Sequence, residues 1–527
     1  MRFTWRMLLS SLADASRDVG LTRSRLAKRR IIAQAIRAAH SPQDTEIAAL
    51  YLSGTLRQRR TGVGWRSLQS LPIPAAEATL TITEVDHALE TMSRLEGPGS
   101  TTRRRDHLDA LFIRATEREQ EFLRGLMTGE VRQGALDGVL LDAIAEAFAV
   151  PLAEVRRAAM LGASSASVAR ALAEDGVAGL DRFRMTPGSP VRPMLAASAP
   201  DVPAAMADRS AEVAVDGKLD GIRLQAHLST EEGERRVRLF TRSLDDITSR
   251  LPEVVEVVLD LPAESAILDG EALVMRDGRP VPFQDSAART ASGADPEALR
   301  SQWPLTVMFF DALHIDGADL IDLPARDRFA ALEKVAGAYL VPRRVTDDVG
   351  EAEEFAKEML SRGHEGVVIK DLDLPYAAGR RGAGWVKVKP RHTLDLVVLA
   401  VEWGSGRRQG LLSNIHLGAR DPRTGGLVML GKTFKGMTDE MLAWQTERFL
   451  ELEQSRSRYA VHVRPEQVVE IAFDGLQRSR RYPGGVALRF ARVLRYRDDK
   501  SAAEADTIDT VLDLARTMGV LDEGSEE

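Results

Sequence analysis

The chain has 527 residues, a net charge of −7 and a hydrophobic share of 44%, which is ordinary for globular protein. The absence of cysteine excludes disulfides, zinc ribbons, iron–sulfur clusters and thiol catalysis, and the nine histidines show no metal-binding spacing. No segment has the apolar length of a membrane span. The basic, then apolar N-terminus is interrupted by Asp14 and Arg17 too early for a signal peptide, so we expect a cytoplasmic protein.

The length predicts about three domains. Although the net charge argues against a nucleic-acid partner, the basic residues gather in clusters at 23–30, 57–60, 103–105 and 478–497. DNA binding needs a local basic face and not a basic total. One cluster alone is more often a solvated helix face, but the recurrence of such clusters in separate regions favours a long anionic ligand.

Residues 1–185 are predicted to be an all-α domain. Apolar residues in 104–127 fall at helical spacing and form one face, and 135–148 gives a second helix. This region offers no nucleophile, base or metal ligand set. The stretch 186–193, rich in proline and glycine, interrupts the periodicity and predicts a domain boundary.

Residues 186–390 are predicted to be an α/β domain with substantial antiparallel sheet. Strand patterns occur at 236–242, 266–275, 305–313, 367–369 and 385–389, and 351–361 is typical of a helix. Asp277-Gly278 predicts a hairpin turn.

Residues 391–502 show short strands separated by turns, with one helix at about 439–454 after a Thr438 N-cap. This pattern suits an OB-fold β-barrel, a fold that commonly handles nucleic acid. The last region, 503–527, is predicted to be an amphipathic helix with a loose acidic end. That end is not expected to touch DNA, because like charges repel.

Two motifs are misleading. Residues 426–433 match the P-loop pattern letter for letter, but their interior Leu-Val-Met-Leu favours a strand and no helix begins after them. Residues 404–410 are one residue too long for GxGxxG and lack a βαβ setting, so they are expected to be a loop.

The chemistry centres on residues 215–223, Val-Asp-Gly-Lys-Leu-Asp-Gly-Ile-Arg, which predict a turn between two strands. The glycines let a ligand approach the backbone, and Asp220 can orient the Lys218 ammonium. A nucleophilic lysine must lose its proton, through desolvation or nearby cations. Taken alone, a motif of this kind is more often a hairpin turn with an exposed ion pair.

Three later motifs supply what nucleotidyl transfer through a lysine requires. Glu271, in Asp269-Gly270-Glu271, and Glu365, at the start of 365–370, are carboxylates suited to Mg²⁺ and a ribose. Lys387 and Lys389 share one face of a strand and can neutralise phosphates, and Phe310 can stack on a base. The basic stretch 489–500 can orient a leaving pyrophosphate.

In their order along the chain, these motifs resemble those of covalent nucleotidyltransferases, specifically ATP-dependent DNA ligases. The resemblance extends to residues 190–196 at the boundary and to 129–135, which is similar to the helical DNA-binding domain of larger ligases. The composition resembles the bacterial, actinobacterial-type branch. The resemblance implies a multidomain protein whose middle domain is an ATP-grasp-like nucleotidyltransferase, with ATP and Mg²⁺ or Mn²⁺ as cofactors.

The resemblance also implies a role for each site residue. Lys218 attacks the α-phosphate of ATP, giving a lysyl-AMP that passes to the 5′-phosphate of a nick, where the 3′-hydroxyl displaces AMP. The nucleotide-binding residues are Asp216 at the adenine amine, Arg223 and Arg242 at ribose and phosphate, Glu271 at the ribose, Phe310 as stacking ring, and Arg381, Lys387 and Lys389 at the phosphates. Glu271 and Glu365 are the metal ligands, and the pyrophosphate-orienting residues are Arg489, Arg492, Arg495, Asp499 and Lys500.

This sequence departs from the family's pattern at three positions. Asp216 stands where the family usually has Glu, Ser243 where Asn or Gly is common, and Ala491 where Pro is usual. The shorter Asp216 side chain puts the adenine contact in question.

Other functions remain open at this point. A GTP-dependent RNA-capping guanylyltransferase shares the lysine chemistry, but the long helical region and the junction at 190–196 argue against it. An NAD-dependent ligase would need zinc-binding cysteines, and a non-catalytic DNA-binding scaffold would not need Lys218, Glu271 and Glu365. We expect a monomeric, nucleoid-associated bacterial protein whose three domains close around nicked duplex DNA, with a role in replication, repair or recombination.

Overall fold

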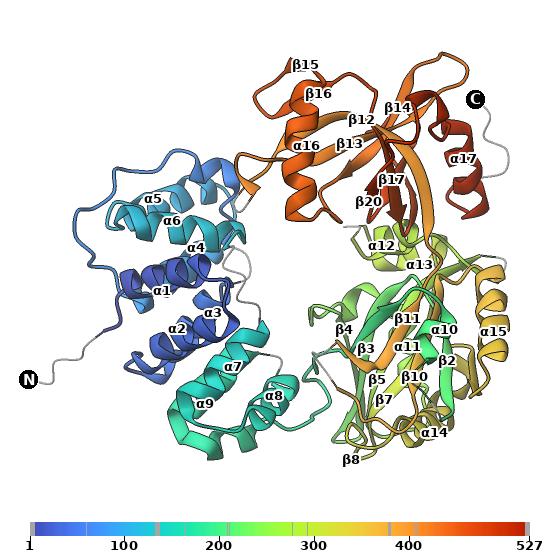
Figure 1. The fold of residues 1–527 in the computed structure, drawn as a ribbon. Coiled ribbons are helices and arrows are strands. Elements are labelled where there is room, and N and C mark those ends of the chain that lie inside the picture. Colours follow the sequence, from blue (N-terminus) through green and yellow to red (C-terminus); the bar gives the residue numbers. More distant parts are fainter. Residues whose placement is uncertain are drawn as a thin grey trace, which may run out of the picture. The chain divides into compact units, whose positions relative to one another are not determined.

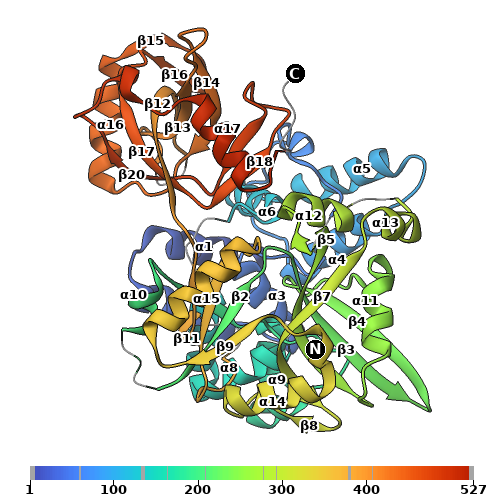
Figure 2. The ribbon, with the colours of Figure 1, turned by 90° about the vertical axis from the view of Figure 1, so that its right-hand side faces the viewer.

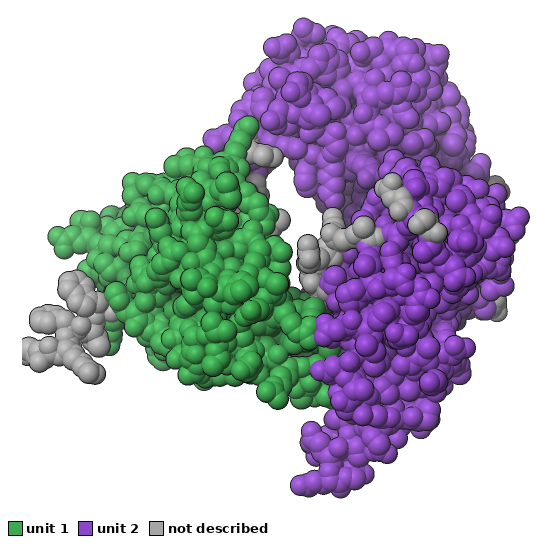
Figure 3. Space-filling view, turned by 60° about the horizontal axis from the view of Figure 1, so that its bottom comes forward, with its two compact units in different colours: residues 1–192 green, residues 193–527 purple. Residues whose placement is uncertain are grey.

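The computed structural model describes residues 6–58, 61–131, 137–162, 164–207, 209, 211–276, 278–291, 294–377, 381–405 and 408–521, without the side chains of 291 and 381–383. The chain forms two compact units, residues 1–192 and 193–527, which Figure 3 colours separately. No described helix is long and apolar enough to cross a membrane.

The first unit is helical, as predicted (Figure 1). Its α-helices are α1 (Leu9–Leu21), α2 (Arg25–Arg37), α3 (Pro42–Leu52), α4 (Ile82–Ser93), α5 (Ser100–Phe112), α6 (Glu117–Thr128), α7 (Asp137–Phe148), α8 (Leu152–Leu161) and α9 (Ser165–Asp175), with 3₁₀ turns at Trp65–Leu68 and Gly176–Arg182. One continuous apolar core joins them, with Leu12, Ile32, Phe112 and Leu123 buried in it.

The apolar face predicted over 104–127 belongs to two helices and not to one. Thr116 ends the gap between α5 and α6, and its side chain accepts a hydrogen bond from the Glu119 backbone N–H. The Glu119 carboxylate accepts one in return from the Thr116 backbone N–H at 2.8 Å. This capping box satisfies N–H groups at the start of α6 and therefore fixes a new helix start.

In the second unit, residues 195–388 form two sheets covered by helices. The first sheet has the order β1-β11-β10-β2-β9, and the second has the order β4-β3-β5-β7-β8, with β6 paired to β5. All pairings between the named strands of these two sheets are antiparallel except β1 with β11, which agrees with the predicted antiparallel character.

The strands are β1 (Leu195–Ala199), β2 (Val213–Lys218), β3 (Ile222–Glu231), β4 (Glu234–Thr241), β5 (Ala266–Arg276), β6 (Arg279–Pro280), β7 (Leu305–Ile315), β8 (Ala318–Asp319), β9 (Arg343–Thr346), β10 (Gly366–Asp371) and β11 (Arg381–Val388). The helices are α10 (Val202–Met206), α11 (Pro252–Leu259), α12 (Phe283–Ala291), α13 (Pro296–Gln302), α14 (Ala325–Ala336) and α15 (Val349–Ser361), with 3₁₀ turns at Thr248–Arg250 and Gly337–Tyr339.

Each sheet buries one face under helices. Helix α15 packs on β2, β9 and β10 (Figure 2), where Phe355 and Met359 meet the apolar strand residues. Helices α11 and α14 bury Val254, Val258 and Leu332 against β3, β5 and β7. The turn between β2 and β3 is the one predicted, and it places Lys218 at the end of β2.

Residues 392–517 contain a seven-stranded sheet whose order is β14-β13-β12-β16-β15, with β17 paired to both β12 and β20. Its strands are β12 (His392–Trp403), β13 (Leu412–Arg420), β14 (Leu427–Thr433), β15 (Glu453–Arg456), β16 (Ala460–Val463), β17 (Val468–Phe473) and β20 (Arg492–Tyr496); β18 (Gly475–Arg478) and β19 (Val486–Arg489) form a separate ribbon. Among the described residues, the strand pairing does not close into a barrel.

Two local predictions in this region are confirmed. Helix α16 (Asp439–Glu451) starts after Thr438, whose side chain accepts from the Met441 backbone N–H at 3.2 Å. The P-loop-like residues form strand β14 and not a phosphate-binding loop. The C-terminal helix α17 (Ile508–Thr517) is shorter than predicted, because a separate 3₁₀ turn (Ala502–Glu504) precedes it.

Candidate functional site

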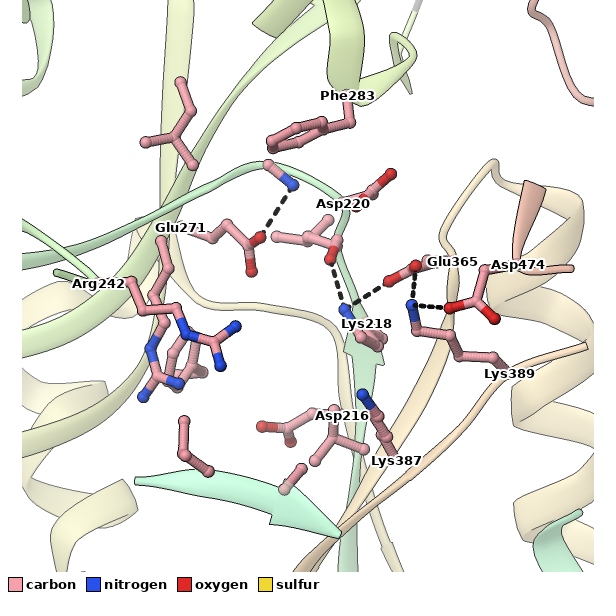
Figure 4. Close-up of a pocket in the computed structure, with 18 of the residues that line it drawn as sticks. Asp216, Lys218, Asp220, Arg242, Glu271, Phe283, Glu365, Lys387, Lys389 and Asp474 are labelled. Carbon is pink, nitrogen blue, oxygen red and sulfur yellow. Dashed lines mark hydrogen bonds and ion pairs between the residues drawn. The ribbon is translucent and has the colours of Figure 1, made fainter. Parts of the chain in front are cut away.

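A cavity of about 850 Å³ in the second unit surrounds the end of β2 (Figure 4). It brings together most of the predicted site residues: Asp216, Lys218, Arg223, Arg242, Glu271, Phe310, Glu365, Lys387, Lys389, Arg489 and Arg492. The side chain of Arg381 lies outside the described residues. Sequence motifs more than 270 residues apart therefore converge on one cavity, between Asp216 and Arg492.

Lys218 is held by carboxylates. Its Nζ lies 2.5 Å from Glu365 Oε2, and it donates a hydrogen bond of 3.1 Å to the carbonyl of Leu219. Burial disfavours the charged ammonium, but the carboxylates of Glu365, Glu271 and Asp220 outweigh it and raise the pKa of Lys218 above its ordinary value. The lysine is thus protonated in this state, and nucleophilic attack requires the removal of that proton.

Two lysines of β11 and its C-terminal extension line the same cavity. Trp385, Lys387 and Lys389 all face the cavity, as the period of two predicts. Lys389 is ion-paired with Glu365 Oε1 and lies 3.7 Å from Asp474 Oδ2. Burial, followed by the charges of Lys389 and Lys218, lowers the pKa of Lys387. These cations give the cavity a wall suited to phosphate groups.

Arg223 lines the cavity, and its guanidinium is held in place by contacts to other residues of the protein. It forms a two-pronged ion pair with Asp269, with Nη2 to Oδ2 at 2.6 Å, and Nη1 donates to the carbonyl of Met194 at 2.7 Å. Tyr376 donates its hydroxyl hydrogen to the same Asp269 oxygen at 2.7 Å. Burial opposes the charge of Arg223, but Asp269 raises its pKa.

Asp216 is almost fully buried, with 2% of its surface exposed. Its carboxylate is ion-paired with Arg343 at 2.6 Å and with Lys370 at 2.7 Å. Burial favours the neutral acid, yet these two cations hold the pKa of Asp216 below its ordinary value. Asp216 is therefore a carboxylate, which can only accept hydrogen bonds.

Glu271 and Phe310 occupy neighbouring strands of the second sheet. Glu271 Oε1 accepts from the Gly221 backbone N–H at 2.8 Å, and burial raises the pKa of its carboxyl despite nearby Lys218. The Phe310 ring meets the Trp385 ring edge to face, with 5.9 Å between centroids.

The predicted pyrophosphate-orienting residues do not all reach the cavity. Arg489 and Arg492 line it, and Arg489 Nη1 pairs with Asp220 Oδ2 at 2.8 Å. The other three form ion pairs elsewhere in the C-terminal region: Arg495 with Glu470, Asp499 with Arg497, and Lys500 with Asp395, each at 2.6 Å.

The carboxylates fit a divalent cation. Glu365 Oε2 is buried and accepts no hydrogen bond, although it is ion-paired with Lys218, so it retains lone pairs for another cation. Over the described ranges, no three potential metal ligands lie together. Mg²⁺ at nucleotide sites usually takes one or two carboxylates, with phosphate and water completing its shell, so the donor set is sufficient.

Sequence reasoning missed several residues around the cavity. Arg343 and Lys370 bind Asp216, whereas Phe283, Lys435, Asp474 and Phe490 line the cavity from α12 and the C-terminal region. Lys370 closes the motif 365–370 and could have been found there. Phe490 lies within the basic stretch 489–500 but was given no role there. The others lie in no motif, and only the folding of distant segments brings them to the site.

The basic clusters predicted to contact DNA are partly engaged within the first unit. Arg104 Nε donates to the Met92 carbonyl at 3.2 Å, and Arg105 Nη1 donates to the Ser67 carbonyl at 2.9 Å. Arg25 pairs with Asp142 at 2.7 Å. Part of this arginine content therefore ties helices and loops together. Residues 59–60 and 132–135, which belong to predicted DNA-binding stretches, lie outside the described residues.

Comparison with known proteins assigns the family. Residues 193–389 match the model of the ATP dependent DNA ligase domain, 408–500 that of the ATP dependent DNA ligase C terminal region, and 66–145 that of the DNA ligase N terminus. The fold is that of a multidomain ligase, with a helical region followed by a nucleotidyltransferase region and a C-terminal region.

Curated relatives agree over nearly the full length. A “Probable DNA ligase” of Beutenbergia cavernae is 62% identical over 97% of this chain and 100% of its own, and one of a Nocardioides species is 60% identical over 96% and 98%. A solved structure, “Pmar-Lig_PreS3”, shares the fold at 17% identity with a TM-score of 0.62, covering 92% of this chain and 99% of its own. The chain belongs to the ATP-dependent DNA ligases.

Gly366, directly after Glu365, is a position where the backbone permits only glycine. Its φ of +147° is one that other residues rarely adopt, and an added Cβ would lie 2.2 Å from the Val388 carbonyl oxygen and 3.2 Å from Lys389 Cα. We expect Gly366→Ala to separate β10 from β11 and to lower the rate of covalent labelling by ATP at least about tenfold. Gly233→Ala, at a turn with φ of +82° and open space around it, is the control for backbone strain alone; equal rates for both variants would contradict the expectation.

Proposed function

We propose that this chain seals nicks in duplex DNA through a lysyl-AMP intermediate, with Lys218 as nucleophile. Lys218 Nζ forms a bond to the α-phosphorus of ATP, the bond to the bridging oxygen breaks, and pyrophosphate leaves. The AMP then passes to the 5′-phosphate of the nick, and the 3′-hydroxyl displaces it. The observation that carries the proposal is the convergence of Lys218, Glu271, Glu365, Lys387 and Lys389 on one cavity.

The chain's own groups prepare the first step. Glu365 Oε2, 2.5 Å from Lys218 Nζ, orients the amine and is the nearest acceptor for the proton that it must lose. Lys387 and Lys389 bind the phosphates, as Arg381 does in this proposal. Arg489, Arg492, Arg495, Asp499 and Lys500 orient the pyrophosphate; the last three must leave the ion pairs that they form here.

The nucleoside lies deeper in the cavity. Asp216 accepts a hydrogen bond from the adenine amine, Phe310 stacks on the base, and Glu271 binds the ribose. Arg223 and Arg242 contact ribose and phosphate. Mg²⁺, or Mn²⁺ in its place, would be held by Glu271 and Glu365 and would supply positive charge that neutralises the phosphates and favours the neutral form of Lys218.

The domain limits belong to the same proposal: a helical DNA-binding domain at 1–185, an ATP-grasp-like adenylation domain at 186–390, an OB-fold domain at 391–502, and a C-terminal helix and acidic tail at 503–527. The matched regions 193–389 and 408–500 support the division near residue 390. We propose a monomer that binds nicked double-stranded DNA in the bacterial cytoplasm, associated with the nucleoid, and acts in replication, repair or recombination.

A labelling experiment tests the proposal. The purified protein is incubated with Mg²⁺ and α-labelled ATP, GTP or NAD⁺, denatured, and examined for label that remains bound. We expect label from ATP alone, and we expect nicked DNA to remove it. Label from GTP alone would indicate a capping enzyme, and no label with nick binding intact would indicate a scaffold.

A further inference from the structure

Arg343 holds the Asp216 carboxylate from the neighbouring strand β9. In the antiparallel pairing of β2 with β9, Asp216 lies directly opposite Arg343. Arg343 Nε donates to Asp216 Oδ1 at 2.6 Å and Nη2 donates to Oδ2 at 2.8 Å. This two-pronged geometry fixes both the position and the plane of the carboxylate, which a single contact would not do.

These contacts leave little accepting capacity on Asp216. A carboxylate has about four acceptor positions. Arg343 takes one on each oxygen, and Lys370 Nζ takes a second on Oδ2 at 2.7 Å. One position remains, on Oδ1. Asp216 also lines the cavity, so it can accept one hydrogen bond from a bound molecule.

Arg343 also connects this acid to the ring that would stack on a base. Its Nη2 donates to the Phe310 carbonyl at 3.0 Å, and Lys370 Nζ donates to the same oxygen at 3.1 Å. The Arg343 guanidinium carbon lies 3.5 Å from the centre of the Phe329 ring, so the guanidinium packs on the ring face and is stabilised in this position. Arg343, which does not itself line the cavity, thus supports both the acid at the edge of a base and the residue at its face, together with Lys370.

We propose that Arg343 is a positioning residue that makes this site select a purine with a 6-amino group, by holding Asp216 as an oriented acceptor. The inference rests on the proposed adenylation function. Adenine presents a donor at this position, whereas guanine presents an oxygen, which an ionised carboxylate repels.

Arg344, the next residue of β9, is the matched control. It lies on the other side of the strand, 42% exposed, where it is 3.9 Å from Glu358 and packs over Phe355. Side chains alternate along a strand, so Arg344 points away from Asp216. Arg344→Met therefore removes the same type of side chain from the same strand and leaves the contacts of Asp216 intact.

The test measures covalent labelling of the full-length protein against the concentration of ATP, GTP and the triphosphate of unsubstituted purine riboside. For Arg343→Met we expect KM for ATP to rise about tenfold, and the preference for ATP over both other nucleotides to fall by a similar factor. The maximal rate with ATP should stay near that of wild type, because Arg343 touches no reacting atom. Arg343→Lys, which retains the charge, should have a KM for ATP and a nucleotide preference between those of wild type and Arg343→Met. Arg344→Met should match wild type in both.

Two results would overturn the inference. One is an unchanged nucleotide preference in Arg343→Met; the other is an equal loss of rate with all three nucleotides, which would show a structural role alone. If Arg343→Met does not fold, an unchanged preference in Arg343→Lys decides against the inference. Failure of the proposed function is separate, because wild-type protein would then take no label from ATP.

Discussion

We expect Lys218→Ala to eliminate the covalent AMP label and the ATP-dependent sealing of nicks. Lys218 is held at the end of β2 by Glu365 and by the Leu219 carbonyl, and no other described lysine has this position, so we expect no second amine to replace it at the α-phosphate. Loss of a nucleophile lowers rates by about 10⁴-fold or more. The measurement is the amount of label that remains after denaturation with α-labelled ATP, with nick binding followed separately.

Two controls make the Lys218 result specific. Lys357→Ala removes an exposed lysine of α15 and should label at the wild-type rate. A nick that already carries AMP on its 5′-phosphate should still be sealed by Lys218→Ala, because that step needs no lysine nucleophile. Persistent label in Lys218→Ala would mean that another residue is the nucleophile.

Local patterns in the sequence predicted much of the fold. The turn between β2 and β3, the strand nature of 427–433 and the Thr438 cap all depend on residues within a few positions of one another. The break before α6 was missed, although Thr116 and Glu119 carry a capping-box signal, because the apolar spacing continues across it. The strand pairing of the C-terminal sheet depends on partners up to 81 residues apart, such as His392 and Phe473, and no local pattern specifies those.

The residues of the site divide in the same way, into those that local motifs predicted and those that only tertiary contacts place. The motifs around Lys218, Glu271, Glu365 and Lys387 were predicted because the nucleotidyl-transfer chemistry needs those residue types. Arg343 was not predicted, since its role arises only when β9 pairs with β2 and places it opposite Asp216. The pairing of Arg489 with Asp220 likewise joins positions that are 269 residues apart. Contacts that support a motif therefore depend on tertiary structure, whereas the motif itself does not.

Glu365→Gln should slow lysyl-AMP formation by about 10²- to 10³-fold, the usual effect of losing one oriented charge in an active site. Glu365 contacts two of the cations of the site, Lys218 through Oε2 and Lys389 through Oε1. The amide has nearly the same shape, so it keeps the packing, but it can no longer neutralise both ammonium groups or accept a proton. Single-turnover labelling with ATP measures the effect, and Glu354→Gln, on the exposed face of α15, is the control.

The pH dependence of the labelling rate that remains in Glu365→Gln identifies why the rate falls. Lys218 attacks only when neutral, so the rate rises with pH through the pKa of Lys218. Burial lowers that pKa, but Glu365 is the largest of the carboxylate contributions that raise it above the ordinary value. Removing its charge must therefore lower the pKa of Lys218, and the rising limb of the pH–rate profile should move to lower pH in Glu365→Gln. A limb that stays in place or moves to higher pH would show that Glu365 does not control the protonation of Lys218, and the slower rate would then come from lost metal or phosphate binding alone.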